Sequence, residues 1–149
     1  MSSDLEAIHR FAARAREFRS WAEGEPAHEP VDEVRLVLDL LVNLYSAALA
    51  LPEGEPPDDE VTATTHEEWL RIYQRCASLP VDMYGEVVAT IGDDIADIHR
   101  DLMRGFQRYE QSRFDHAAWE WAFHFRVHWG HHATAALNAL HAWWADHSG

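Results

Sequence analysis

Apolar residues recur at intervals of three and four positions along five segments of the chain. This spacing places them on one face of a helix, so each segment is predicted to form an amphipathic helix. The predicted helices span about residues 3–22, 30–51, 66–79, 93–110 and 114–146. Their number and short connections predict an all-α fold: a single-domain up-and-down bundle of about five helices over residues 1–149, ending in a long aromatic-rich helix.

Polar residues at the predicted helix starts support these boundaries. Ser3 with Glu6, and Thr65 with Glu68, have the spacing of a capping box, in which the hydroxyl accepts from a backbone N–H of the first turn. Asp93 is a good N-cap for the fourth helix. We therefore expect Ser3, Thr65 and Asp93 to begin their helices.

One residue and one segment depart from the helical pattern. Gly130 lies inside the last helix, where glycine costs ~1 kcal/mol relative to alanine, so we expect a close helix contact or a kink there. Residues 80–92 carry β-branched residues and two glycines without a clear period, and we expect an irregular segment with one short extended piece.

The chain is strongly acidic, with a formal net charge of −14. Three prolines, one glycine and five carboxylates occupy residues 52–64, which predicts an exposed acidic loop. The electric field of this negative charge repels phosphate backbones and anionic lipids, so we expect neither nucleic acid nor membrane as a partner. A basic protein fits this charge as a partner, although acidic surfaces also serve solubility alone.

A single cysteine, Cys76, excludes an intramolecular disulfide and a multi-cysteine zinc site. It lies in an apolar stripe, so we expect an inert buried thiol. The longest apolar run, residues 36–51, is interrupted by Asp39 and Asn43 and is shorter than the ~20 residues that span a bilayer. With no secretory pattern at the N-terminus, we expect a soluble cytoplasmic protein.

The first group of residues with chemical potential is GDDIADIHRDL, residues 92–102. On a helical wheel, Asp94, Asp97 and Asp101 lie at the rim of the apolar face. They are candidates for a ligand-binding cluster. The simpler interpretation is surface pairing of Asp97 with Arg100 and of Asp101 with Arg104.

The second group is WEWAFHFRVHWGHH, residues 119–132, in which His124, His128 and His132 follow one another at i, i+4 spacing. That spacing suits metal ligation, and zinc or iron would need further ligands from another helix. No cofactor is assigned firmly; a divalent metal is the candidate. The predicted ligands are Asp94, Asp101, His128 and His132. Alternatively, the histidines are core residues hydrogen-bonded to carboxylates.

Other familiar sites are not indicated. Glu6 and His9 form a single E-x-x-H pair that lies off the apolar stripe, whereas di-iron bundles need two such pairs and two further glutamates facing inward. H-E-x-x-H, a phosphate-binding glycine loop and G-x-S-x-G do not occur. The sequence therefore does not identify an enzyme.

The segments DDIADIHRDL and HWGHHATAALNALH resemble a family of small bacterial all-helical proteins of unknown function, marked by a DDLADIYRDL-like helix and an HWGxH helix. The resemblance covers nearly the whole chain. His99 stands where tyrosine is more usual. The resemblance supports the fold and favours His128 and His132 over the other histidines. The matching residues are Asp93, Asp94, Asp97, Arg100, Asp101, His128, Trp129, Gly130 and His132.

Three functional hypotheses follow. The first is a non-enzymatic protein-interaction module that uses exposed tryptophan or the acidic loop. The second is a metal or small-ligand site between the fourth and fifth helices, with hydrolysis as a candidate chemistry. The third is a structural contact in which histidines of the last helix bond carboxylates of the fourth. The oligomeric state stays open. The candidate cluster is Asp94, Asp97, Arg100, Asp101, Trp121, His128, Trp129 and His132.

Overall fold

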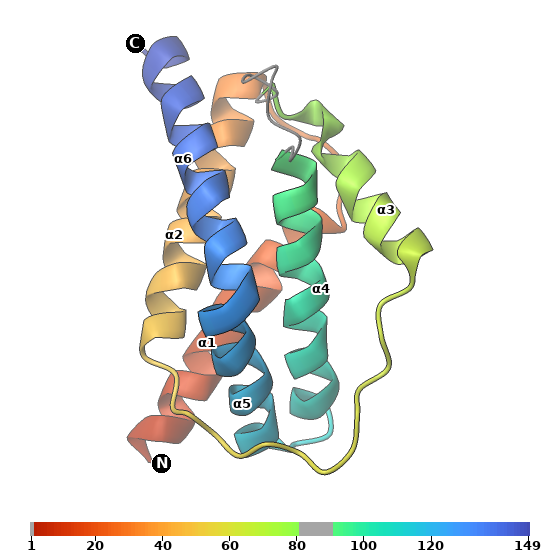
Figure 1. Ribbon diagram of the computed structural model, residues 1–149. Helices are drawn as coiled ribbons and strands as arrows, with labels where there is room; N and C mark the ends of the chain where they lie inside the picture. Colours follow the sequence, from red (N-terminus) through yellow and green to blue (C-terminus); the bar gives the residue numbers. More distant parts are fainter. Residues whose placement is uncertain (1, 81–90) are drawn as a thin grey trace.

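The structure is a computed structural model and describes residues 2–80 and 91–149. That part of the chain is helical and contains no strand (Figure 1), so the all-α prediction is confirmed. None of its helices combines the length and apolar composition that a bilayer crossing needs. The elements are α1 (Ser3–Ala22), α2 (Pro30–Leu49), α3 (His66–Arg75), the 3-10 turn η1 (Cys76–Ser78), α4 (Ile91–Tyr109), α5 (Phe114–His124), the π-helical turn η2 (Phe125–Trp129) and α6 (Gly130–His147).

Helix α4 is the central element of the bundle. It packs against α3 on one side and against α5 and α6 on the other, while α2 packs against α1 and α6. Figure 1 shows α5, η2 and α6 as one continuous helical run beside α4, as predicted for the last helix. Side chains of α4 therefore contact neighbouring helices on both of its sides.

The predicted capping residues are partly correct. Thr65 caps α3, because its hydroxyl accepts from the Glu68 N–H at 3.1 Å. At the first helix the cap is Ser2, which accepts from the Leu5 N–H at 3.1 Å, and not Ser3. Ser2 has the extended backbone that a cap requires, whereas Ser3 is already helical.

The start of α4 also differs from the prediction. The helix begins at Ile91, so Asp93 lies within its first turn and is not its N-cap. A carboxylate there still interacts favourably with the helix dipole. Of the predicted irregular segment, residues 81–90 lie outside the described part of the chain, and Ile91 and Gly92 are helical.

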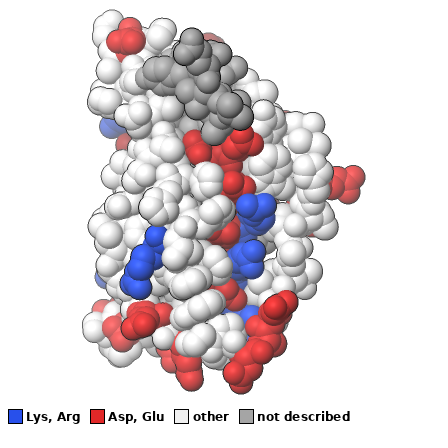
Figure 2. All heavy atoms as spheres, in the orientation of Figure 1, with Lys and Arg blue, Asp and Glu red and all other residues white. Residues whose placement is uncertain are grey.

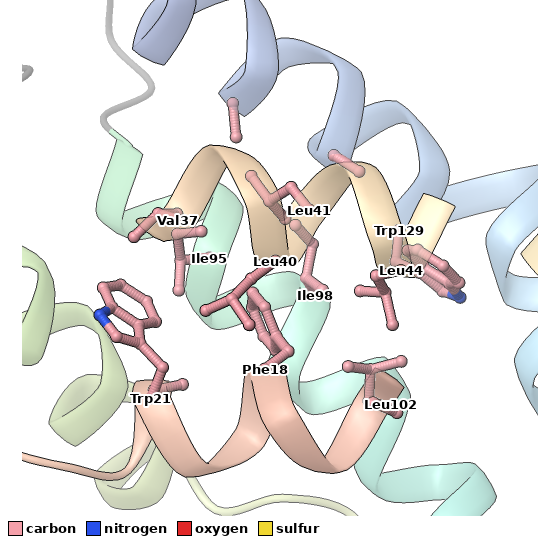
Figure 3. Packing of buried hydrophobic residues seen from close by; sticks show 14 of the residues in the cluster. Phe18, Trp21, Val37, Leu40, Leu41, Leu44, Ile95, Ile98, Leu102 and Trp129 are labelled. Carbon is pink, nitrogen blue, oxygen red and sulfur yellow. The ribbon is translucent and has the colours of Figure 1, made fainter. Parts of the chain in front are cut away.

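The core joins all the α-helices of the described chain, and large aromatic residues fill its centre. Trp121, Trp129, Phe11, Phe18 and Phe106 are among its largest fully buried side chains. Figure 3 shows aliphatic residues of α2 and α4 packed between Phe18 of α1 and Trp129 of η2. Burial of such side chains supplies the main favourable free energy of folding.

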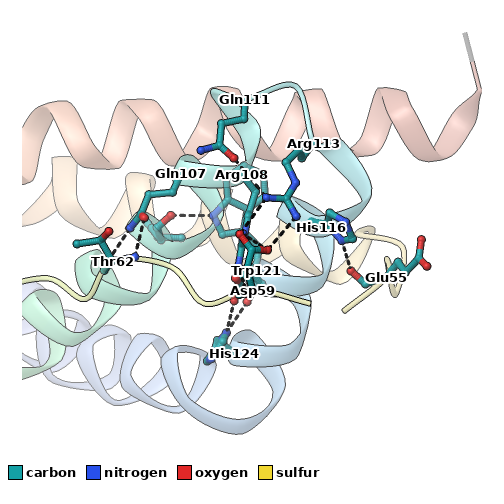
Figure 4. Close-up of polar contacts among 12 residues, drawn as sticks. Glu55, Asp59, Thr62, Gln107, Arg108, Gln111, Arg113, His116, Trp121 and His124 are labelled. Atoms are coloured by element: carbon teal, nitrogen blue, oxygen red, sulfur yellow. Dashed lines mark hydrogen bonds and ion pairs between the residues drawn. The ribbon is translucent and has the colours of Figure 1, made fainter. Parts of the chain in front are cut away.

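The acidic segment 52–64 is tied to the bundle along its length (Figure 4). The Gln107 amide donates to the Thr62 carbonyl at 2.8 Å and accepts from its N–H at 2.9 Å. At the other end His116 Nδ1 lies 2.8 Å from the Glu55 carbonyl. The segment is largely exposed, as predicted, but it is held against α4 and α5.

Arg108 is the buried anchor of this segment. Its guanidinium donates to the Asp59 carboxylate at 2.9 Å and to the Glu120 carboxylate at 3.2 Å. Arg113 also donates to Asp59, and these hydrogen bonds hold the pKa of the Asp59 carboxyl well below its usual range. The ion pair between Arg108 and Glu120 is almost fully buried.

We expect Glu120→Ala to lower the free energy of unfolding by about 3–5 kcal/mol, because it removes one partner of a buried ion pair and leaves Arg108 poorly compensated. Asp59→Ala is the matched control: its side chain is 60 % exposed, so the loss should be clearly smaller. Urea denaturation of both variants measures this difference. Equal midpoints for the two variants would show that the buried pair is not the anchor.

Candidate metal centre

Carboxylates of α4 face histidines of η2 and α6 across the central helix contact. Asp94, Asp97 and Asp101 recur at i, i+3 and i+7, which places them along one side of α4. Figure 2 shows acidic and basic side chains together in a column over α4, between α6 and α3. Asp94 and Asp101 are largely buried, whereas 17 % of the Asp97 side chain is exposed.

Each imidazole forms a hydrogen bond to a carboxylate through its Nδ1 atom. His128 Nδ1 lies 2.6 Å from Asp101 Oδ2, and His132 Nδ1 lies 2.8 Å from Asp94 Oδ1. An ionised carboxylate only accepts hydrogen bonds, so Nδ1 of each ring carries the hydrogen. When such a ring is neutral, its Nε2 atom carries a free lone pair that can bind a cation.

The two Nε2 atoms converge on Asp97. They lie 3.3 Å apart, and Asp97 Oδ2 lies 3.1 Å from His132 Nε2. All three atoms lie within 4.8 Å of one another. The other oxygen of Asp97 accepts from the Trp69 indole at 2.8 Å and from Arg100 at 2.9 Å. Three acceptor atoms from three positioned side chains therefore face one point.

The spacing of these atoms matches metal coordination. Zinc binds nitrogen at about 2.0–2.1 Å, so neighbouring ligands of a tetrahedral site lie about 3.3 Å apart. In this arrangement Asp97, His128 and His132 form the group that could hold a metal ion. Asp94 and Asp101, which the sequence analysis placed among the ligands, instead bond the far side of the two imidazoles. The Arg100–Asp97 and Arg104–Asp101 pairs that the sequence predicts are both present.

The charges at the site favour a cation. Burial raises the pKa of the Asp94 carboxyl, and the charges of Asp93 and Asp97 act in the same direction, while the hydrogen bond from His132 opposes them. A group of carboxylates this close together repels itself electrostatically. A bound positive charge relieves that repulsion.

His128 lies within the π-helical turn η2. A π turn adds one residue, which rotates the following side chains by about 100° relative to a continuous α-helix. The N–H of Gly130 bonds the Phe125 carbonyl five residues earlier. A Cβ on Gly130 would meet that oxygen and lie 2.9 Å from Cδ1 of the Phe125 ring. Gly130 thus accommodates the π turn of its own helix. The close contact with another helix, one of the two alternatives predicted from the sequence, is not what requires the glycine.

Other predicted members of the cluster lie elsewhere. Trp121 and Trp129 are fully buried, and their indole N–H groups donate to the backbone carbonyls of Leu102 and Trp121, at 2.9 and 3.0 Å. His124 bonds the Glu120 carbonyl of its own helix. These residues contribute to the core and helix and not to the converging atoms.

Three further outcomes concern single residues. Trp69, which no sequence pattern assigned to the site, joins it from α3 through Asp97. His9, half of the E-x-x-H pair, lies 2.5 Å from the Tyr109 hydroxyl and away from the converging atoms. Cys76 is buried as expected, and burial raises the pKa of its thiol to about 12.

The chain matches one family model and is similar to a solved crystal structure. The family model "Domain of unknown function (DUF5063)" matches residues 4–146. A crystal structure of protein BF1032 from Bacteroides fragilis is 23 % identical, with a TM-score of 0.79 over 91 % of this chain and 93 % of that one. At this identity the likeness shows the fold alone. No curated protein matches the chain.

We expect Gly130→Ala to lower the free energy of unfolding by about 1–3 kcal/mol, because the added methyl group overlaps the Phe125 carbonyl and ring. Helix propensity alone predicts the opposite sign, a gain of about 1 kcal/mol. Thermal or urea denaturation decides between them, with His131→Ala as an exposed neighbouring control. A stabilised Gly130→Ala protein would contradict the role given to the π turn.

Cys76 should be inert in the folded protein. With a thiol pKa of about 12, against 9.0 for an unperturbed thiol, the folded protein holds on the order of a thousandfold less thiolate at about pH 9. Raising the pH through 9 ionises the thiol of the unfolded chain first and therefore also favours unfolding. Mass spectrometry after iodoacetamide treatment should show slow labelling of the native protein and fast labelling in guanidinium chloride. Equal rates would contradict the burial.

Proposed function

This chain belongs to the DUF5063 family, and we propose that its helical bundle binds one divalent metal ion between α4 and α6, with Asp97, His128 and His132 as ligands. The observation that carries the proposal is the convergence of two imidazole Nε2 atoms and one carboxylate oxygen. Each of the three side chains is also fixed by a partner on its far side. Such outer partners are the usual support of metal-ligating histidines.

A proton alone satisfies this arrangement poorly. If one imidazole Nε2 carries a hydrogen, it can donate that hydrogen to only one of the two other atoms. The remaining acceptor atom then lies close to the other two without a hydrogen bond. His132 Nε2 is close to both of the other atoms, at 3.1 Å from Asp97 Oδ2 and 3.3 Å from His128 Nε2. A divalent cation accepts all three lone pairs at once, and it compensates the nearby carboxylates as well.

The ligand set points to a transition metal. Two imidazoles and one carboxylate suit zinc or iron(II), whereas magnesium and calcium prefer oxygen ligands. His128 and His132 are 37 % and 26 % exposed at the side chain, so solvent reaches the ion. Three protein ligands and an open position are the pattern of reactive zinc sites, which activate water. Metal-dependent hydrolysis is therefore the reaction class that we propose to test.

The interaction-module hypothesis has less support from the geometry. Four of the seven tryptophans are buried, and the remaining three, Trp69, Trp119 and Trp144, are half-buried. The acidic segment 52–64 is occupied in bonds to α4 and α5. A basic protein partner stays a prediction from the net charge.

The metal-free protein should take up about one equivalent of zinc per chain and melt at a higher temperature, since a ligand at a hundred times its Kd stabilises by ~2.7 kcal/mol. His128→Asn and His132→Asn should abolish tight binding. An asparagine amide can still donate to Asp101 or Asp94, yet it lacks the Nε2 ligand. His131→Asn, one position away and exposed, is the matched control.

Elemental analysis and calorimetric titration measure this outcome, with manganese and iron(II) tested beside zinc. Asp101→Asn and Asp94→Asn provide a graded check, because loss of an outer partner lowers metal affinity by about 10–100-fold without removing a ligand. A wild-type protein that binds none of these ions and whose melting they do not shift would overturn the proposal.

A further inference from the structure

A hollow of about 370 Å³ shares Asp97 with the proposed metal site. Asp97 forms part of its wall, so one carboxylate faces both the converging Nε2 atoms and the hollow. The remaining wall comes from α3 and the residues before it, and from Arg100 of α4. The lining residues are Thr64, Thr65, His66, Trp69, Asp97 and Arg100.

Within the described residues 2–80 and 91–149, the Arg100 side chain makes one hydrogen bond, so it has further donors to offer to this hollow. A guanidinium group has five N–H donors in a planar fork, and the Arg100 side chain spends one bond, of 2.9 Å, on Asp97 Oδ1. Its side chain is 36 % exposed. Trp69 bonds the same carboxylate oxygen, so Asp97 keeps a partner when Arg100 turns toward a ligand.

The local charge differs from that of the whole protein. The net charge of −14 repels anions at long range, but that field is screened over about 8 Å in physiological salt. At the hollow, the Arg100 guanidinium and a bound divalent ion are positive, and Asp97 is the carboxylate that lines the wall. Asp94 and Asp101 are turned toward the imidazoles and largely buried. A small anion at this point meets attraction from two sides.

Aromatic rings form the outer part of the wall. The His66 ring stacks on Trp69 at 5.9 Å between centroids, and Trp69 stacks in turn on Tyr73 at 5.5 Å. Such a platform offers a flat apolar surface beside a charged pole. The hollow therefore combines a site for an oxyanion with a surface for an organic group attached to it.

We propose that this hollow binds the oxyanion of a small phosphate-bearing molecule, with one oxygen on the metal and another on the Arg100 guanidinium. The inference rests on the proposed metal site and names the substrate class of that site. Arginine forms strong, paired hydrogen bonds to phosphate, and metal ions bind the phosphate oxygens directly. A carboxylate shares the oxyanion chemistry, so the test includes both.

The test uses the full chain loaded with cobalt(II), whose visible absorption reports a change of ligands at the metal. Cobalt binding to each variant is titrated first. Inorganic phosphate should then change the spectrum saturably. With each protein saturated in cobalt, so that any loss of cobalt affinity from the missing Arg100–Asp97 bond is allowed for, Arg100→Gln should weaken phosphate binding by about tenfold or more. Arg100→Lys, which keeps the charge but loses the fork, should fall between them. Arg35→Gln, an exposed arginine of α2, is the control.

The outcomes separate the two proposals. Saturable phosphate binding that depends on Arg100 supports the inference. Acetate binding as tightly as phosphate, with the same dependence on Arg100, overturns the phosphate assignment in favour of a carboxylate. Cobalt binding without any effect of phosphate or acetate overturns the inference and leaves the metal site intact. Failure to bind cobalt, zinc, manganese or iron(II) overturns both.

Discussion

The hydrogen bonds from His128 to Asp101 and from His132 to Asp94 are the interactions on which the rest of the site depends. They bury two carboxylates at the contact of α4 with the last helices, and they fix both the tautomer and the rotation of each imidazole. The structural contact and the metal centre are therefore not competing interpretations. The Nδ1 side of each ring joins the helices, and this is what leaves the two Nε2 atoms facing Asp97.

The bundle supplies the rigidity that this arrangement needs. Trp121 and Trp129 are fully buried with their indole N–H groups satisfied by backbone carbonyls, and Gly105 of α4 leaves room for the Trp121 ring. A well-packed aromatic layer restricts the helices that carry the ligands. On the other side of α4, Trp69 reaches Asp97 from α3. Three helices thus control the position of three proposed ligand atoms.

Sequence periodicity predicted the helices because amphipathic spacing is a local property of the chain. It missed two helix starts: Ser2 and not Ser3 caps α1, and Asp93 lies inside α4, since a cap depends on backbone angles that neighbouring residues do not determine. The helical wheel placed the carboxylates of α4 and His128 and His132 together correctly. The choice of Asp97 as the converging carboxylate depends on the π turn and on the packing of α3, and neither has a clear sequence signal.

The most direct measurement is an anomalous difference map from crystals of the protein grown with zinc, recorded on both sides of the zinc absorption edge. The account predicts one strong peak about 2.0–2.2 Å from His128 Nε2, His132 Nε2 and an Asp97 oxygen, with Asp94 and Asp101 still on the Nδ1 atoms. A map without a peak at this point, or a peak bound by Asp94 or Asp101 in place of the Nε2 atoms, would contradict it.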